Sequence, residues 1–158
     1  MEKYEKTRGW RNNNPLNIVR SSDYCWVGSA EQQTDSRFVV FTNMSYGYRA
    51  AIKTLQSYVK ALRLQGLTYN LQNIIYRWCP SKGYLQYAEN VAKWSGISST
   101  TKELPEPQKA LPLFAKIMAA MTRQECGVPP EHLPWVYIKG GIYLAYKVKI
   151  TDDSLGIK

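Results

Sequence analysis

The sequence has few of the residues that build metal sites, disulfide frameworks or histidine-dependent catalysis. It contains only three cysteines, Cys25, Cys79 and Cys126, and a single histidine, His132. An odd number of cysteines without CxxC spacing argues against both a disulfide framework and a zinc site. One histidine excludes mechanisms that need two, and nothing in the sequence supports a Ser-His-Asp arrangement. We therefore expect no metal and no cofactor.

Long apolar runs are also missing. No stretch approaches the roughly 20 apolar residues of a membrane-spanning helix, and residues 1–6 form no apolar signal region. We therefore expect synthesis in the cytoplasm without a signal peptide, and no membrane insertion.

Acidic residues are scarce beside basic ones. The chain has 12 Asp and Glu against 21 Lys and Arg, a net charge of +9. A protein with this charge usually binds an anionic partner, such as a nucleic acid, a membrane surface or an acidic wall polymer. The positive charge is spread along the chain without a basic cluster, which argues against a nucleic-acid-binding domain. The 12 Tyr and 5 Trp can fill a core, and they also stack on sugar rings and bases.

The 158 residues fit one domain, 1–158, with flexible ends at 1–7 and 151–158. The pattern predicts a mainly α (α+β) fold with a small β element. Residues 1–20 are polar and Asn-rich, which predicts a loop. The spacing of apolar residues and of Gly and Pro then predicts the remaining elements. These are strands over 24–27 and 37–42, helices over 45–64, 68–78, 81–94 and 112–125, and a loop over 98–107. The segment 134–150 is ambiguous, since Gly140-Gly141 fits a hairpin turn or a helix break, but helical spacing favours a helix.

One carboxylate stands out on the helix predicted over 112–125. Leu113, Ile117 and Met121 recur every four residues, and the next member of the series is Glu125. Burial raises the pKa of a carboxyl group, and the negative end of a helix raises it further. A carboxylic acid that stays protonated near neutral pH is what a glycosidic general acid requires. The alternative is a solvated helix end with Arg123 nearby.

Two other acids lie in the polar segment between the predicted strands. Glu31 and Asp35 are each either a second carboxylate facing a cleft or part of a solvated loop, and Asp35 is also placed to cap a turn.

Several motifs occur in order along residues 8–97. The segment 8–18, R-G-W-R-N-N-N-P-L-N-I, resembles the R-G-x-R-N-N-N-P-G-N-I motif of phage- and prophage-type peptidoglycan-degrading proteins with a lysozyme-like fold, some of which are virion structural proteins. The further matches are 26–28 to W-x-G, 35–41 to D-x-x-F-x-x-F, 46–50 to G-x-R-A, 74–80 to I-I-x-R-W-A-P and 87–91 to Y-x-x-x-V.

Residues 121–127, M-T-R-Q-E-C-G, look like the I-x-R-x-E-N-G end of a helix in these proteins. In many lysozyme-like enzymes the helix with the catalytic Glu precedes the N-N-P-G-N segment, whereas here it follows. The resemblance therefore implies a circularly permuted lysozyme-like domain with Glu125 as catalytic acid. Leu16 stands where the motif has Gly, and Cys126 stands where Asn is common, so an inactive copy is also open.

The resemblance implies a peptidoglycan-cleaving glycosidase of endolysin type, either a lytic transglycosylase or a muramidase. Asn14 and Asn17 would bind acetamido groups, unless the Asn-rich turn is purely structural. Tyr84 and Tyr87 would line the sugar cleft, although Tyr87 also fits a helix core. Trp26 and Trp78 are predicted as core residues.

A hydrolase needs a second carboxylate, whereas a lytic transglycosylase uses the sugar's own 6-hydroxyl. No second acid here matches a catalytic position, which favours transglycosylase chemistry or a muramidase of undetermined mechanism. The expected partners are peptidoglycan glycan strands and phage virion components, with no nucleic acid. The protein would reach the cell wall or periplasm after release or as part of a virion. The alternative is a catalytically inactive virion structural protein with the same fold.

Overall fold

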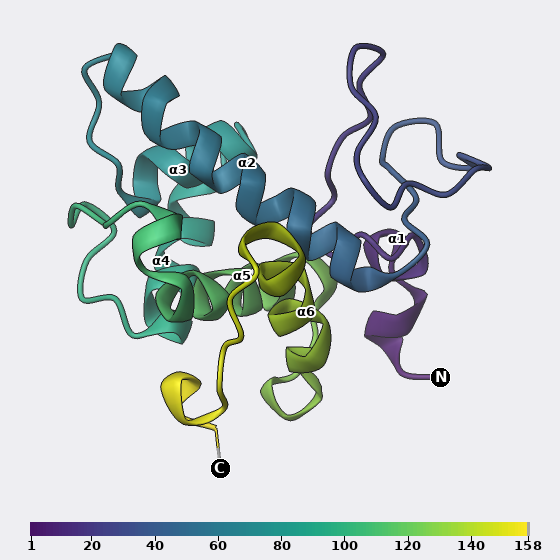
Figure 1. The fold of residues 1–158 in the computed structure, drawn as a ribbon. Coiled ribbons are helices and arrows are strands. Elements are labelled where there is room, and N and C mark those ends of the chain that lie inside the picture. Colours follow the sequence, from purple (N-terminus) through teal and green to yellow (C-terminus); the bar gives the residue numbers. More distant parts are fainter. Residues whose placement is uncertain (158) are drawn as a thin grey trace.

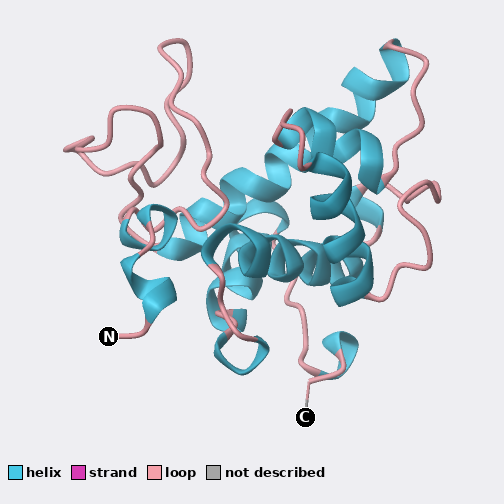
Figure 2. Cartoon of the chain, turned by 180° about the vertical axis from the view of Figure 1, so that it is seen from behind, coloured by secondary structure: helices cyan, strands magenta, loops and turns pink. Residues whose placement is uncertain are grey.

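The computed structural model describes residues 1–157, and this part of the chain is mainly helical (Figures 1 and 2). The α-helices are α1 (Arg8–Arg11), α2 (Met44–Leu64), α3 (Leu71–Trp78), α4 (Tyr84–Ser95), α5 (Leu111–Cys126) and α6 (Trp135–Tyr146). The 3-10 turns are η1 (Lys3–Lys6), η2 (Pro107–Lys109), η3 (Pro130–His132) and η4 (Asp153–Leu155). The helices predicted over 45–64, 68–78, 81–94, 112–125 and 134–150 are confirmed, with shifted ends.

The loop predicted over residues 1–20 is wrong for its first half. Residues 3–6 form η1 and residues 8–11 form α1. The Glu5 carboxylate caps the start of η1 by accepting from the Glu2 N–H at 2.9 Å. These short polar turns carry no apolar stripe, so the hydrophobic pattern could not reveal them. The ends predicted as flexible thus include helical turns, and Leu155 of η4 packs into the core.

The strands predicted over 24–27 and 37–42 are also wrong. Among residues 1–157, β-pairing is confined to two isolated bridges, Val19 with Phe38 and Ser29 with Phe41. Side chains occupy the backbone groups that a ladder would use. The Gln33 amide donates to the carbonyl oxygens of Ala30 and Val40 and accepts from the Val40 N–H, each at 2.8–2.9 Å. We call residues 12–43 the loop region.

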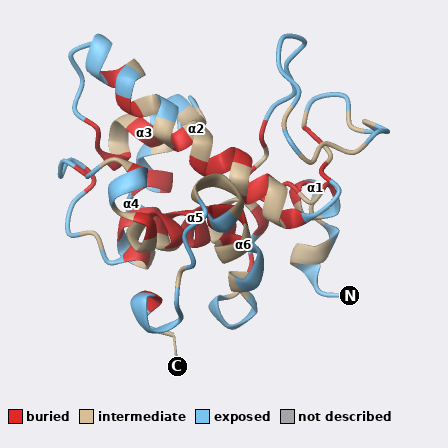
Figure 3. Cartoon of the chain, viewed as in Figure 1, coloured by how far each residue is buried: buried red, intermediate tan, exposed pale blue. Residues whose placement is uncertain are grey.

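The buried apolar residues form one continuous core around α5. Phe114, Ile117 and Met118 on this helix are completely buried. Figure 3 shows that the buried surface is concentrated on α5 and on the faces of the helices around it, whereas much of the loop region is exposed. Because α5 is surrounded on most sides, the residue at its C-terminal end is held in a fixed position.

The glycine pair in the last helix serves close helix packing. Gly141 lies against α2, where an added Cβ would come within 2.5 Å of the Tyr48 Cβ. The chain remains helical through Gly140 and Gly141, so the hairpin alternative is excluded. This contact fixes α6 on the face of α2.

The loop region docks on the start of α2 through another glycine. A Cβ on Gly47 would lie 2.5 Å from the carbonyl oxygen of Asn13. Gly47 belongs to the segment that matches G-x-R-A, and Asn13 belongs to the Asn-rich segment. The Asn-rich motif and the G-x-R-A motif therefore meet in space, and this close contact is possible only because Gly47 has no side chain.

None of the helices within residues 1–157 is both long and apolar enough to cross a bilayer. In the same range, no group of three His, Cys, Asp or Glu side chains is placed to hold a metal ion.

Candidate functional site

Glu125 lies in the last turn of α5, just before Gly127 ends the helix in a left-handed conformation (φ 69°). Its carboxylate is half-buried and accepts two hydrogen bonds from distant parts of the chain. The Asn17 Nδ2 donates to Oε1 at 3.1 Å, and the Tyr87 hydroxyl donates to Oε2 at 2.9 Å. Three of the predicted site residues therefore meet, one each from the loop region, α4 and α5.

The surroundings of Glu125 act on its pKa in opposite directions. Burial raises the pKa and is the largest influence, whereas the Asn17, Tyr87 and Trp78 side chains lower it by stabilising the carboxylate. The net result is a raised pKa, as the position on the apolar helix face predicts. Burial, followed by the nearby Glu125 carboxylate, also raises the pKa of Tyr87 well above its ordinary value. The site thus combines a protonatable acid with donors that stabilise its ionised form.

Asn17 reaches Glu125 because of an unusual backbone conformation. Its φ is +56°, in the left-handed region that Asn tolerates better than most residues. Among residues 1–157, its buried Oδ1 has no hydrogen-bond partner. The contact with Glu125 is therefore the polar interaction that orients this side chain.

Leu16 does not narrow the site. It has no positive φ, and its side chain is 1% exposed within the core. The residue that takes the left-handed conformation in this turn is Asn17, so the turn does not need the Gly of the motif at position 16.

Cys126 links α5 to the same turn. Its buried thiol donates to the Pro15 carbonyl oxygen at 3.4 Å, and burial raises its pKa to about 11. The thiol therefore stays protonated at neutral pH and acts as a structural contact.

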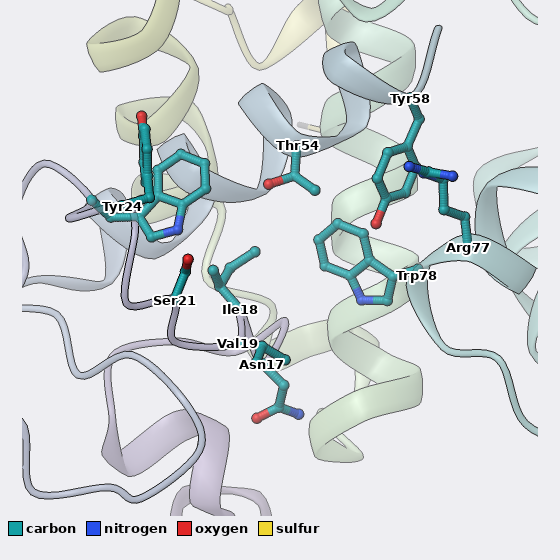
Figure 4. Close-up of a pocket in the computed structure, with 10 residues that line it drawn as sticks. Asn17, Ile18, Val19, Ser21, Tyr24, Thr54, Tyr58, Arg77 and Trp78 are labelled. Carbon is teal, nitrogen blue, oxygen red and sulfur yellow. The ribbon is translucent and has the colours of Figure 1, made fainter. Parts of the chain in front are cut away.

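A pocket of about 380 Å³ opens beside the partners of Glu125 (Figure 4). It lies between the loop region and helices α2 and α3. Its wall consists of Asn17, Ile18, Val19, Ser21, Tyr24, Trp26, Thr54, Tyr58, Arg77 and Trp78. Asn17 and Trp78 connect the two features, because each lines the pocket and also influences the Glu125 carboxylate. Glu125 itself is not a lining residue, so the pocket is joined to the acid through Asn17 and Trp78.

The aromatic lining corrects one expectation and adds residues that the sequence did not indicate. Trp26 and Trp78 are half-buried and line the pocket, so they are not purely core residues. Tyr24 and Tyr58 complete the aromatic wall. Tyr24 lies outside the predicted helices and Tyr58 shares α2 with core residues, so only the folded chain shows that they face each other across one pocket.

Asn14 is structural, and the expectation that it binds substrate is wrong. The side chain is fully buried. Its Nδ2 donates to the carbonyl oxygens of Ile18 and Val39 at 3.0 and 2.9 Å, and its Oδ1 accepts from the Ile18 N–H at 2.9 Å. No polar atom of this side chain is left for a sugar.

Asp35 is a turn cap, and the expectation that it supplies a second carboxylate is contradicted. Arg8 donates to it from Nε at 2.6 Å and from Nη2 at 2.7 Å, and Asn12 donates at 3.0 Å. The backbone N–H groups of Arg37 and Phe38 also donate to it, at 2.8 Å each. The Arg8 guanidinium and then these other donors hold the pKa of Asp35 far below its usual range. This carboxylate is fully engaged and remains ionised.

Glu31 and Tyr84 lie away from the pocket. Glu31 is exposed and lines a neighbouring hollow, not the pocket beside Glu125. Tyr84, at the start of α4, packs edge-on against Tyr76 with ring centres 4.9 Å apart, and it is not part of the pocket wall. The structure therefore does not bring these two predicted residues to Glu125.

Comparison with known proteins gives one informative relative. No family model matches the chain. Protein P5 of Pseudoalteromonas phage PM2 is 33% identical over 130 residues, which cover 80% of this chain and 75% of the relative.

Proposed function

The chain belongs to the family of protein P5 of Pseudoalteromonas phage PM2, and from this premise we propose that it is a phage peptidoglycan-cleaving glycosidase with Glu125 as its general acid and base. The observation that carries the proposal is the half-buried Glu125 carboxyl, held by Asn17 and Tyr87 next to an aromatic pocket. The phage relationship itself says nothing of activity.

The proposed reaction starts with protonated Glu125. It donates its proton to the glycosidic oxygen, the bond from this oxygen to C1 breaks, and positive charge develops on the sugar ring. The resulting carboxylate is stabilised by the hydrogen bonds from Asn17 and Tyr87. It then takes a proton from the nucleophile that attacks C1, which restores the acid.

The arrangement of the other acids favours lytic transglycosylase chemistry over hydrolysis by a muramidase. Asp35 is engaged by five hydrogen bonds, and Glu31 lines a different hollow. In a transglycosylase the attacking group is the sugar's own 6-hydroxyl, so the product is a 1,6-anhydro sugar and no second carboxylate is needed.

The fold that we propose is a circularly permuted lysozyme-like domain. Support comes from the way the matched segments gather in space around one site. Asn17, Trp78, Tyr87 and Glu125 come from four different matched segments, and the first three all act on the carboxyl group of the fourth. The protein would reach the peptidoglycan after release or as a component of the virion.

The test is mass spectrometry of the soluble products formed from purified peptidoglycan. We expect anhydromuropeptides from the wild type. Glu125→Gln should lower the rate by at least about 100-fold, because it removes the proton donor. Glu131→Gln, which changes an exposed acid outside the site, is the matched control and should behave as the wild type.

Other outcomes of the same experiment have distinct meanings. Products with reducing ends would show hydrolysis and require a second carboxylate that approaches only with substrate bound. No release from several peptidoglycan types by a folded protein would reject the enzyme and support a virion structural role.

A further inference from the structure

The pocket beside Glu125 carries positive charge and no negative charge. Arg77, near the end of α3, lines it, and the guanidinium carbon lies 5.2 Å from the centre of the Tyr58 ring (Figure 4). None of the ten lining residues is acidic. An arginine that rests on an aromatic face keeps its donors in a defined plane, which suits recognition of a carboxylate.

The positive charge continues into an adjoining hollow of about 550 Å³ along α2. This hollow shares Tyr24, Trp26 and Thr54 with the first pocket, and it adds Arg49 and Lys53 to the lining. We call the two together the groove. It thus combines aromatic surfaces, which suit sugar rings, with cations on its rim.

These cations have no carboxylate partner in the described chain. Within residues 1–157 the salt bridges join Arg8 with Asp35 and Lys139 with Asp152. Glu125 accepts its hydrogen bonds from Asn17 and Tyr87, and Asp35 is paired with Arg8. The groove therefore has uncompensated positive charge where the substrate would lie.

We propose that Arg77 binds a carboxylate carried by a substituent of the glycan, so that the groove selects peptide-bearing strands over uncharged amino-sugar polymers. This inference rests on the proposed function and names the substrate feature that the same site recognises. The sugar rings would lie along the aromatic wall with a glycosidic oxygen at Glu125. The stem peptide, which bears free carboxylates, would extend toward Arg77.

A purely structural role for Arg77 makes a different prediction. If the residue served only to pack on Tyr58, its loss would affect stability and would not discriminate between charged and uncharged substrates. The deciding quantity is therefore a ratio of rates on two substrates, one with free carboxylates and one in which these carboxylates have been neutralised.

The first experiment compares native peptidoglycan with the same material after its free carboxylates have been converted to methylamides. We expect the wild type to cleave the native form about tenfold faster. Arg77→Gln should bring this ratio to about one through a higher KM on native material, and Arg77→Lys should restore part of it. Arg63→Gln removes the same charge from an exposed site on α2 outside the groove, so it should keep the wild-type ratio. An Arg77→Gln ratio equal to that of the wild type would overturn the proposal.

The second experiment measures binding without cleavage. Glu125→Gln is titrated calorimetrically with a soluble peptidoglycan tetrasaccharide that carries its stem peptides, and with the methylamidated form. We expect about tenfold tighter binding of the charged form, and loss of this difference in Glu125→Gln/Arg77→Gln. Equal affinities for the charged and the methylamidated form would overturn the carboxylate proposal. It would also be overturned if Glu125→Gln bound a single-stranded DNA oligonucleotide as tightly as the charged tetrasaccharide and lost this affinity with Arg77→Gln. If the wild type cleaves nothing but the affinity difference is present, the enzyme proposal fails and carboxylate recognition stands.

Discussion

The loop region and the helical part of the molecule are held together by different forces. Residues 12–43 depend on polar side chains that replace a β-ladder, above all Asn14 and Gln33, which bond backbone groups on both sides. The helices depend on apolar packing around α5, where Phe114 and Ile117 are completely buried. The candidate site lies where the two regions meet, so its geometry depends both on the polar hydrogen bonds of the loop region and on the apolar packing around α5.

The difference shows why the two sides of the site have different roles. α5 presents Glu125 from a tightly packed helix, which fixes the position of the acid. The loop region supplies Asn17 and one wall of the pocket from segments with little regular structure. We therefore expect local opening of the loop region to abolish substrate binding and cleavage under conditions in which the helices are still folded.

The strongest test of this comparison is Asn14→Ala. It leaves the Ile18 and Val39 carbonyl oxygens and the Ile18 N–H without their partner, and we expect a loss of roughly 3 to 5 kcal/mol in the loop region. Helical circular dichroism should persist, while amide exchange within 12–43 accelerates and cleavage is lost. Equal acceleration of exchange in α5 would show instead that the two regions unfold as one unit.

A matched pair on α2 tests the helical part. Leu55 is completely buried and Leu64 is 78% exposed. Leu55→Ala should lower the free energy of unfolding by about 3 kcal/mol through lost burial and a cavity, measured by urea denaturation. Leu64→Ala should change it by less than about 0.5 kcal/mol. Similar losses in the two variants would contradict the burial of this helix face.

The pattern of apolar residues was sufficient to predict these helices, but not the loop region. Core helices repeat hydrophobic side chains every three or four residues, and Gly66 and Gly96 mark ends that the structure has. The loop region instead depends on contacts between distant polar groups, such as Arg8 with Asp35, which no local pattern records.

The same limit applies to the candidate site. The helix periodicity singled out Glu125, and the family resemblance added Asn17 and Tyr87. The aromatic wall and Arg77 come together only through tertiary packing. Asn14 was predicted to bind substrate and Asp35 to be a second carboxylate. Both predictions failed because the sequence does not distinguish a polar residue that holds a loop from one that faces a substrate.

The pH dependence of stability separates the two regions further. Hydrogen bonds from Arg8 and other donors lower the pKa of Asp35, so this group stabilises the fold above the unfolded pKa of about 4. That contribution is lost as pH falls through the lower folded pKa. Asp35→Asn should therefore have a lower thermal midpoint than the wild type at neutral pH. The difference between the two midpoints should become smaller as the pH falls. Asp23→Asn, at an exposed acid of the same region, is the control. A constant difference across this range would contradict the assignment.

The contribution of Glu125 to stability should change with pH in the opposite direction to that of Asp35, and its effect on the thermal midpoint should be the smallest of those predicted here. Burial raises its pKa, so the protonated group favours folding at low pH, and this contribution is lost as pH rises through the folded pKa. Glu125→Gln should therefore raise the thermal midpoint at neutral pH, by about 1 to 3 °C, and lose this advantage in acid. A lower midpoint at neutral pH would show that the ionised carboxylate is stabilising.

The hydrogen bond between Asn17 and Glu125 joins residues 108 positions apart in the sequence. Contacts of such long range form late in folding, because a long stretch of chain must be closed first. During synthesis the acid leaves the ribosome long after the loop that orients it. A nascent or partly folded chain therefore lacks the complete site, so the wall-cutting chemistry proposed for this protein would begin only when folding is complete.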